Sequence, residues 1–138
     1  EGIMRKIEDT SVFIEMTREI RVSVLPEYLE DHSDPVKHVY AFAYTVTIEN
    51  FGSEKVQLLK RHWIVNSGGA EYTQVKGDGV VGEQPVLEGN EGYQYTSGTV
   101  IKDPVGTMHG TYLFRGADGA LFNVVIPRFD LIYPHLLH

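Results

Sequence analysis

Alternation of bulky and small side chains over residues 40–49 constrains the fold of this chain more than any other feature. The even positions from 40 to 48 are all bulky and apolar, whereas the odd positions are small or polar. Successive side chains of a strand point to opposite faces, so this pattern predicts a half-buried strand. Residues 12–24 keep one parity in the same way, interrupted at Arg18. They predict one long N-terminal strand with a bend or bulge near 17–19.

Residues 56–65 predict another strand, but their parity is irregular. The apolar side chains at 56 and 58 share one face with Lys60, whereas Trp63 shares the other face with Arg61. Two alternatives stay open: the register changes at a bulge, or both faces are partly covered.

Turn-forming residues separate these runs at short intervals. They cluster at 50–53, 66–69 and 116–119, and the last of these contains an Asp-Gly step typical of a hairpin. No window shows an apolar stripe at helical spacing, so the fold class predicted is all-β. We expect an immunoglobulin-like or fibronectin type III-like antiparallel β-sandwich of about seven or eight strands, with Trp63 buried between the sheets.

Length and charge narrow the classes of function. The 138 residues predict a single domain (1–138), of which residues 1–10 are expected to form a loosely ordered N-terminal extension. The net charge is −7, from 12 basic and 19 acidic residues, which argues against nucleic acid and anionic membrane as partners. No apolar run is long enough for membrane insertion. The chain has no cysteine, which excludes a disulfide, and a cytoplasmic location is expected.

The glycines of the sequence GDGVVG at 77–82 match a dinucleotide-binding motif, but no helical pattern follows them. Gly77, Gly79 and Gly82 could still form a nest of backbone amides for pyrophosphate or another anion, with Lys76 as the adjacent cation and Arg61 as a further anchor. The alternative is structural: the glycines supply positive φ angles or close backbone approach, and Arg61 anchors hydrogen bonds.

Catalytic and metal chemistry have little support in the residues. No nucleophile has an identifiable base, so no enzymatic activity, catalytic residue or cofactor is predicted. His62 and His109 could lie on neighbouring strands as a two-nitrogen cobalt site, and the acidic loop around Asp34 could offer oxygens to magnesium. Neither set reaches three converging ligands, and no metal site is predicted.

The C-terminal run 126–134 is apolar and has prolines at both ends. Pro127 predicts an edge strand or a bulge. Such a strand could present Phe129, Leu131 and Tyr133 to a partner protein. Alternatively, the tail folds back and caps the sandwich.

Seven short runs carry a resemblance to a known family. In chain order they are FAYTVTIEN at 42–50, VQLL at 56–59, RHWI at 61–64, GVVGEQP at 79–85, YTSG at 95–98, MHGTY at 108–112 and IPRF at 126–129. The chain closely resembles the bacterial ApaG family from about residue 12 to its C-terminus. It departs from the family pattern at 66–67 and at Lys60, which affects local surface chemistry only.

The resemblance implies a fibronectin type III-like sandwich and a link to cobalt resistance and magnesium efflux, without an established enzymatic activity. Related domains of eukaryotic F-box proteins and of a polymerase-delta-interacting protein imply protein interaction, and the family's glycine motif implies pyrophosphate binding. Our leading hypothesis is a non-enzymatic domain that binds an unknown protein partner. The alternatives are a binder of a pyrophosphate-containing nucleotide and a weak divalent-metal binder.

Overall fold

The computed structural model describes residues 11–69 and 71–136. The prediction for residues 1–10 lies outside this part of the chain. Strands dominate the described residues, joined by short turns and two single-turn 3-10 helices, η1 (Glu30–His32) and η2 (Pro35–Lys37). The nine strands are β1 (Phe13–Thr17), β2 (Ile20–Tyr28), β3 (Tyr40–Asn50), β4 (Val56–Asn66), β5 (Tyr72–Asp78), β6 (Val86–Leu87), β7 (Gly92–Ile101), β8 (Val105–Gly116) and β9 (Leu121–Ile132).

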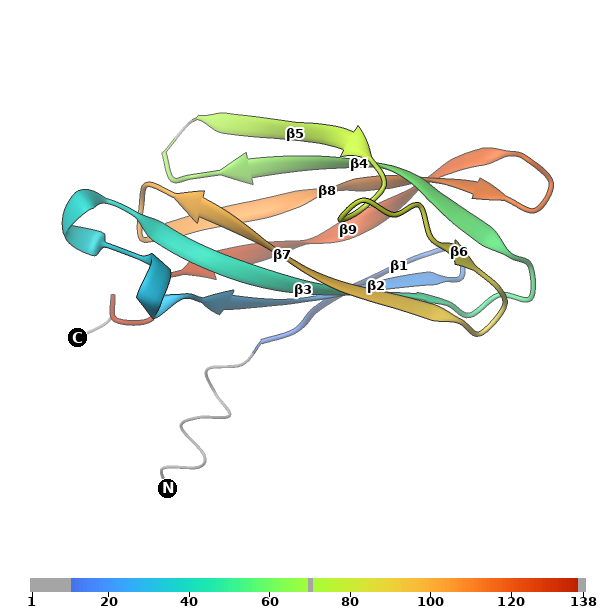
Figure 1. Cartoon of the computed structure of the whole chain (residues 1–138), viewed down its shortest axis with the longest axis horizontal. Helices are drawn as coiled ribbons and strands as arrows, with labels where there is room; N and C mark the ends of the chain where they lie inside the picture. Colours follow the sequence, from blue (N-terminus) through green and yellow to red (C-terminus); the bar gives the residue numbers. More distant parts are fainter. Residues whose placement is uncertain (1–10, 70, 137–138) are drawn as a thin grey trace, which may run out of the picture.

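The strands form two sheets packed face to face (Figure 1). One has four strands in the order β1-β2-β3-β7, and the other has five, in the order β5-β4-β8-β9 with the short β6 beside β4. Every pairing between strands is antiparallel. The predicted antiparallel β-sandwich is therefore confirmed, with slightly more strands than expected.

The core is built from the inward-facing positions of both sheets. All five even positions of β3 from Tyr40 to Ile48 are buried, as the alternation predicts. Trp63 is buried between the sheets, with its ring centroid 5.2 Å from that of Tyr44 and 5.9 Å from that of Phe129. Burial of each such large apolar side chain contributes about 1.5–3 kcal/mol.

The prediction of one long N-terminal strand is wrong. The chain reverses after Thr17, which is paired with Ile20, and Arg18 takes a φ of 53° in the two-residue turn. The reversal puts β1 antiparallel to β2. Because of it, the even-numbered apolar side chains of β2 face the core, whereas those of β1 face outward. Val22 is fully buried, whereas Ile14 and Met16 point outward.

Two bulges account for irregular sequence patterns. In β4 the register shifts between Leu58 and Lys60, so the first of the two alternatives, a register change, is correct. The pairing of β8 with β9 shifts between Met108 and Gly110, opposite Pro127, and β9 is the last strand of its sheet. Pro127 therefore marks both an edge strand and a bulge, where its missing N–H is tolerated.

Candidate functional site

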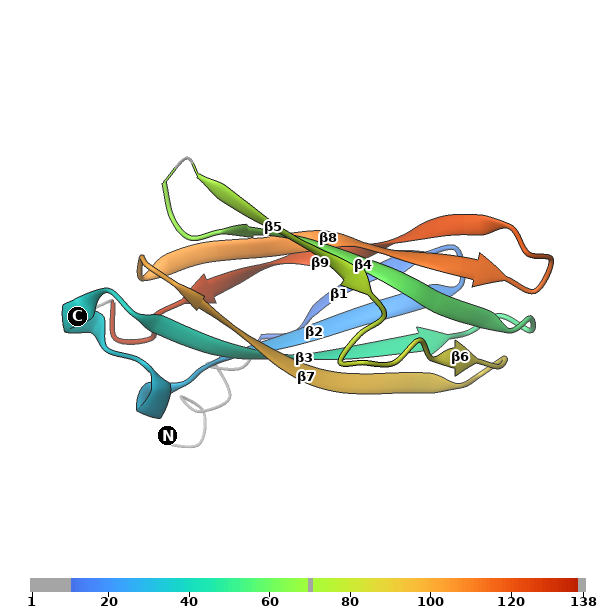
Figure 2. The same ribbon diagram turned by 45° about the horizontal axis from the view of Figure 1, so that its top comes forward.

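The glycine loop, residues 77–83, leads from the end of β5 toward β6 and crosses from the five-stranded sheet toward β7 (Figure 2). Beyond the end of β5, three amides of the loop bond to backbone carbonyls: Gly79 N–H donates to Leu59 at 2.8 Å, and Val80 and Glu83 exchange two bonds of 2.8 and 2.9 Å. Val80 is fully buried in the core. The loop is thus a turn pinned to the sandwich by one apolar side chain.

Each glycine of the motif has its own geometric reason. A Cβ on Gly77 would come within 2.8 Å of the guanidinium carbon of Arg61. Gly79 has a φ of +64°, and a Cβ there would overlap the carbonyl of Glu83. Gly82 has a φ of +83° and open space around it. Positive φ is the conformation for which glycine is preferred.

Arg61 lies beside this loop on the core-facing side of β4, where it is paired with Gly77 on one side and Tyr112 on the other. Its Nη1 donates to the carbonyls of Asp78 and Gly79, both at 3.0 Å. Because Gly77 has no side chain, the guanidinium can pass over β5 and reach these carbonyls. The structure thus brings Arg61 and the glycine loop together.

A buried tyrosine cluster lies in the core within electrostatic reach of Arg61. Tyr95 and Tyr112 share a hydrogen bond between their hydroxyls across the two sheets. Burial raises the pKa of Tyr95 and of Tyr112 above the usual value, and burial raises the pKa of Tyr44 as well. The positive charge of Arg61 opposes all three shifts but is too weak to reverse them.

Two adjoining hollows lie on the outer face of the five-stranded sheet. Their volumes are about 420 and 510 Å³, and both are lined by His62 and Thr111. We call them together the outer groove. The predicted cation Lys76 lies in the second hollow with Lys60, at pairing positions beside His62 and Asp78 respectively.

The histidine pair predicted as a cobalt site lines the first hollow. His62 and His109 lie on the neighbouring strands β4 and β8, and His62 Nε2 is 2.9 Å from Oε1 of Gln74. Within the described part of the chain, no three His, Asp or Glu residues converge as metal ligands do, and Asp34 lies apart beside η2.

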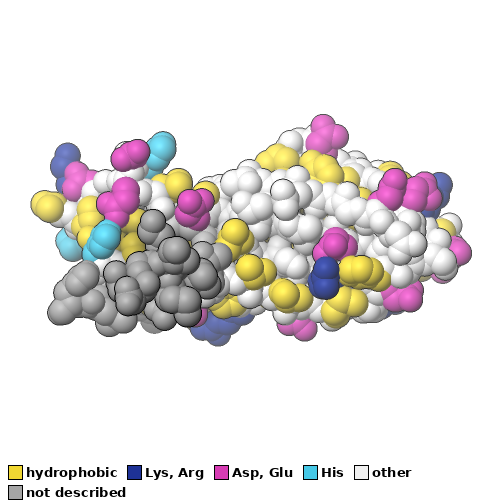
Figure 3. Space-filling view, turned by 90° about the horizontal axis from the view of Figure 1, so that it is seen from below, with side chains coloured by type: hydrophobic (Ala, Val, Ile, Leu, Met, Phe, Trp, Pro, Cys, Tyr) yellow, Lys and Arg dark blue, Asp and Glu magenta, His cyan; other side chains and the backbone are white. Residues whose placement is uncertain are grey.

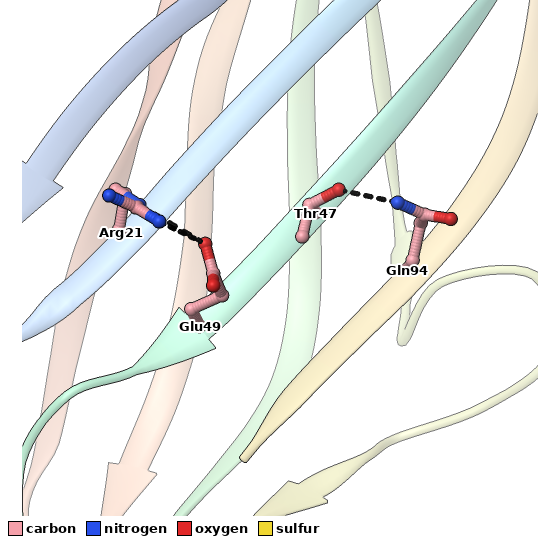
Figure 4. Close-up of polar contacts among 4 residues, drawn as sticks. All are labelled: Arg21, Thr47, Glu49 and Gln94. Atoms are coloured by element: carbon pink, nitrogen blue, oxygen red, sulfur yellow. Dashed lines mark hydrogen bonds and ion pairs between the residues drawn. The ribbon is translucent and has the colours of Figure 1, made fainter. Parts of the chain in front are cut away.

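The outer face of the four-stranded sheet has a different chemistry (Figure 3). At its β1–β2 margin lie four exposed aliphatic side chains, which we call the apolar strip: Val12, Ile14, Met16 and Leu25. Beside them β3 and β7 present small polar side chains, with Thr47 accepting a hydrogen bond from Gln94 at 2.8 Å (Figure 4). The ion pair of Arg21 with Glu49, 2.8 Å apart, lies at one end of this face (Figure 4).

Two of the three C-terminal residues predicted to contact a partner lie inside the molecule, and the third, Tyr133, is partly buried. Phe129 and Leu131 are fully buried. Tyr133 packs edge-to-face against Tyr28 and Tyr40, with centroids 5.2 and 5.4 Å apart. This placement corresponds to the alternative in which the tail caps the sandwich, and the partner surface expected on these side chains has to be revised. The residues of β9 that face outward are the alternate ones, such as Arg128 and Asp130.

Sequence reasoning missed the apolar strip and the outer groove. The strip was assigned to the core because Ile14 and Met16 share the parity of Val22. The turn at Arg18 lacks the Asn-Gly or Asp-Gly step that marks a two-residue hairpin, so the sequence contained no signal for the reversal. The outer groove joins residues as far apart in sequence as Lys60 and Asn123, so only the strand order could reveal it.

Comparison with known proteins places this structure in a family. The model of the ApaG domain matches residues 30–116. The chain is 49% identical over 120 residues to Protein ApaG of Nitrosomonas eutropha, covering 87% of this chain and 94% of that protein. It is 50% identical over 117 residues to Protein ApaG of Klebsiella pneumoniae, covering 85% and 94%.

Solved structures agree with this assignment. The crystal structure of the putative ApaA protein from Bordetella pertussis superimposes with a TM-score of 0.82 at 46% identity, covering 84% of this chain and 94% of that one. A further X-ray structure, of a structural genomics target, gives a TM-score of 0.81 at 43% identity over 90% of this chain.

No helix among the described residues has the length and apolarity needed to cross a membrane. The names of the relatives indicate no catalytic activity. The chain belongs to the ApaG family.

Proposed function

We propose that this protein is a non-enzymatic protein-binding domain and that the apolar strip is its contact surface. The observation that carries the proposal is the exposure of Ile14 and Met16, 56% and 49%, on the outward face of the β1–β2 hairpin. Exposed aliphatic side chains are stabilised when a partner removes them from water. A group of them on one sheet margin commonly marks an interaction site. This surface replaces the one predicted on Phe129 and Leu131, whose side chains are buried.

The surroundings of the strip suit a protein interface. An interface typically combines an apolar centre with a polar rim. Here Arg21 and Glu49 neutralise each other at the rim, and the Arg21 guanidinium lies 4.8 Å from the ring centroid of Phe51. On the neighbouring strands the outward hydroxyls of Thr45 and Thr96 are hydrogen-bonded to each other, 2.9 Å apart. A partner could therefore cover the strip without leaving Arg21 or Glu49 unpaired, and it would have to supply a cation for the exposed carboxylate of Glu27 on the same face of β2.

Site-specific photo-crosslinking tests the proposal. A photoreactive phenylalanine at Ile14 or Leu25 should give a crosslink to one defined partner in the cells that contain the protein, and Met16→Ser should reduce its yield at least 10-fold. The matched control is Val36, which is 89% exposed but lies away from the strip in η2. Equal crosslinking from all three positions, or none from the strip, would overturn the proposal. A crosslinked dimer, checked by sedimentation, would identify the partner as a second copy.

A second candidate function is the binding of a pyrophosphate-containing nucleotide at the glycine loop. The observation in its favour is Val81, a β-branched residue with a φ of 42° directly before Gly82 at +83°. This conformation is a strained one for valine, and strain of this kind is concentrated at functional sites. Within the described structure the amides of Val81 and Gly82 donate to no backbone carbonyl, so they could receive phosphate oxygens.

Backbone-amide NMR titration with inorganic pyrophosphate and adenosine diphosphate tests this candidate. Saturable shifts should be centred on Val81 and Gly82, and Lys76→Met should weaken the binding. Lys37→Met is the control, because it removes the same charge from a residue in η2. Shifts absent from the loop, or equal weakening by the two variants, would reject nucleotide binding there. The roles in cobalt and magnesium homeostasis implied by the family stay predictions.

A further inference from the structure

The outer groove carries a local excess of positive charge in an acidic protein. Its lining includes three outward-facing cationic side chains, Lys60, Lys76 and Arg128, against two carboxylates, Glu15 and Asp78. Arg61 also borders the groove, but its guanidinium is turned toward the glycine loop and donates to backbone carbonyls there. The whole chain has a net charge of −7. A concave surface lined by positive charge focuses the electric field and attracts anionic ligands, even when the molecule as a whole is negative.

These cations have few partners of their own. The two ion pairs among the described residues, Arg21 with Glu49 and His135 with Glu30, both lie elsewhere. Lys60 and Lys76 form neither an ion pair nor a side-chain hydrogen bond within that part of the structure. The donors of both ammonium groups are therefore free for an anionic ligand.

The size and floor of the groove indicate what kind of anion it takes. It runs from Lys76 on β5 across β4 and β8 to β9, three strand spacings or about 14 Å. That length accommodates about four residues of extended chain. Between the charged groups the floor is apolar, with Ile64, Leu113 and Val125. A single phosphate group would use one end only, whereas a peptide of alternating acidic and apolar residues matches the whole groove.

We propose that the outer groove binds an extended acidic segment of a partner protein. Acidic side chains of the segment bind Lys60 and Lys76, and its intervening apolar side chains pack on the floor. Thr111 and Asn123 offer polar groups along the path. The groove lies mainly on the five-stranded sheet and approaches the apolar strip at β1, where Glu15 lines the groove between Ile14 and Met16. It takes a different chemistry from the strip and gives the domain a second contact surface.

The probe is a fluorescein-labelled octapeptide of alternating Glu and Val, titrated by fluorescence anisotropy at low and at moderate salt. We expect saturable binding that weakens with salt, with amide shifts on β4 and β8. The variant Lys60→Glu/Lys76→Glu should weaken it at least 10-fold, and Lys60→Arg/Lys76→Arg should retain it. The matched control, Lys37→Glu/Lys55→Glu, changes the net charge equally on exposed turns and should bind as the parent does.

Three results would overturn this proposal. One is binding that does not saturate, and another is equal weakening by the two charge-reversal variants, which would mean unspecific attraction. The third is full displacement of the peptide by inorganic pyrophosphate with shifts confined to residues 79–83. That result would mean that the lysines serve a binding site for a small anion and not for a peptide. Crosslinking at Ile14 tests the apolar strip alone, so failure of that proposal can be told apart from failure of the peptide-binding proposal.

Discussion

Gly79 is the position of the glycine loop that tolerates a side chain least. Gly79→Ala should lower the free energy of unfolding by about 3 kcal/mol, since it combines a left-handed backbone cost of about 1–2 with overpacking of about 1–3 against the Glu83 carbonyl. Gly82→Ala should lower the free energy of unfolding only by the left-handed backbone cost, because there is open space around Gly82. Urea unfolding followed by the fluorescence of Trp63 measures both. Equal losses would show that the Glu83 contact is not limiting.

Asn50 is a buried polar side chain that ties together two connections, the β3–β4 turn and the segment between β6 and β7. It is 2% exposed, its Nδ2 lies 2.8 Å from the carbonyl of Glu54 and within 3.3 Å of two more at 87 and 88, and its Oδ1 accepts from Gly52. Asn50→Asp replaces the donor by a charge that faces carbonyls, so the free energy of unfolding should fall by about 2–4 kcal/mol at neutral pH. Lowering the pH in urea melts should recover part of the loss, as the carboxyl protonates. A loss independent of pH would contradict this reasoning.

The tyrosine cluster joins β3, β7 and β8 and makes the pairing of the two sheets sensitive to alkaline pH. The folded-state pKa values of Tyr44, Tyr95 and Tyr112 are all raised, chiefly by burial. Below about pH 10, both folded and unfolded chains keep these phenols protonated. Above it the unfolded chain loses protons that the folded chain retains, so the free energy of unfolding falls as pH rises.

Urea midpoints between about pH 8 and 11 measure this effect. The slope in the alkaline limb should reach at most about 1.4 kcal/mol per pH unit for each group, and Tyr112→Phe should make it shallower. Tyr72→Phe is the matched control, because Tyr72 is 64% exposed on β5. If Tyr72→Phe and Tyr112→Phe changed the slope equally, burial would not be its cause.

Among the elements, the strands were predictable and the turns were only partly so. Alternation over residues 40–49 predicted β3 because a two-residue period follows directly from strand geometry. The Asp-Gly step at 118–119 predicted the β8–β9 hairpin, where Gly119 has a φ of 85°. Arg18 gave no such signal, because its positive φ is imposed by the pairing of β1 with β2 and not by its own preference. One missed turn therefore misplaced a whole strand.

At the scale of the molecule, the sandwich was predictable and its two candidate surfaces were not. Fold class depends on local periodicity and on turn spacing, which the sequence contains. The apolar strip depends on which face of β1 turns outward, and the outer groove on which strand lies beside β4. Arg61 and the glycine loop are an intermediate case: 17 residues separate Arg61 from Asp78, yet the motif itself directed attention to both.

The two proposed surfaces lie mainly on different sheets and approach each other at β1, where Glu15 lines the groove. Variants that leave Glu15 unchanged are predicted to act independently. Ile14→Ser/Met16→Ser and Lys60→Glu/Lys76→Glu change side chains that are at least partly exposed and share no contact, so their effects on the free energy of unfolding should add within about 0.5 kcal/mol. Each pair alone should cost little, because surface substitutions are usually within about 0.5 kcal/mol per site. Urea unfolding of the two double variants and of the quadruple variant provides the comparison. A coupling well above that limit would mean that the core transmits changes between the sheets, and binding at one surface would then alter affinity at the other.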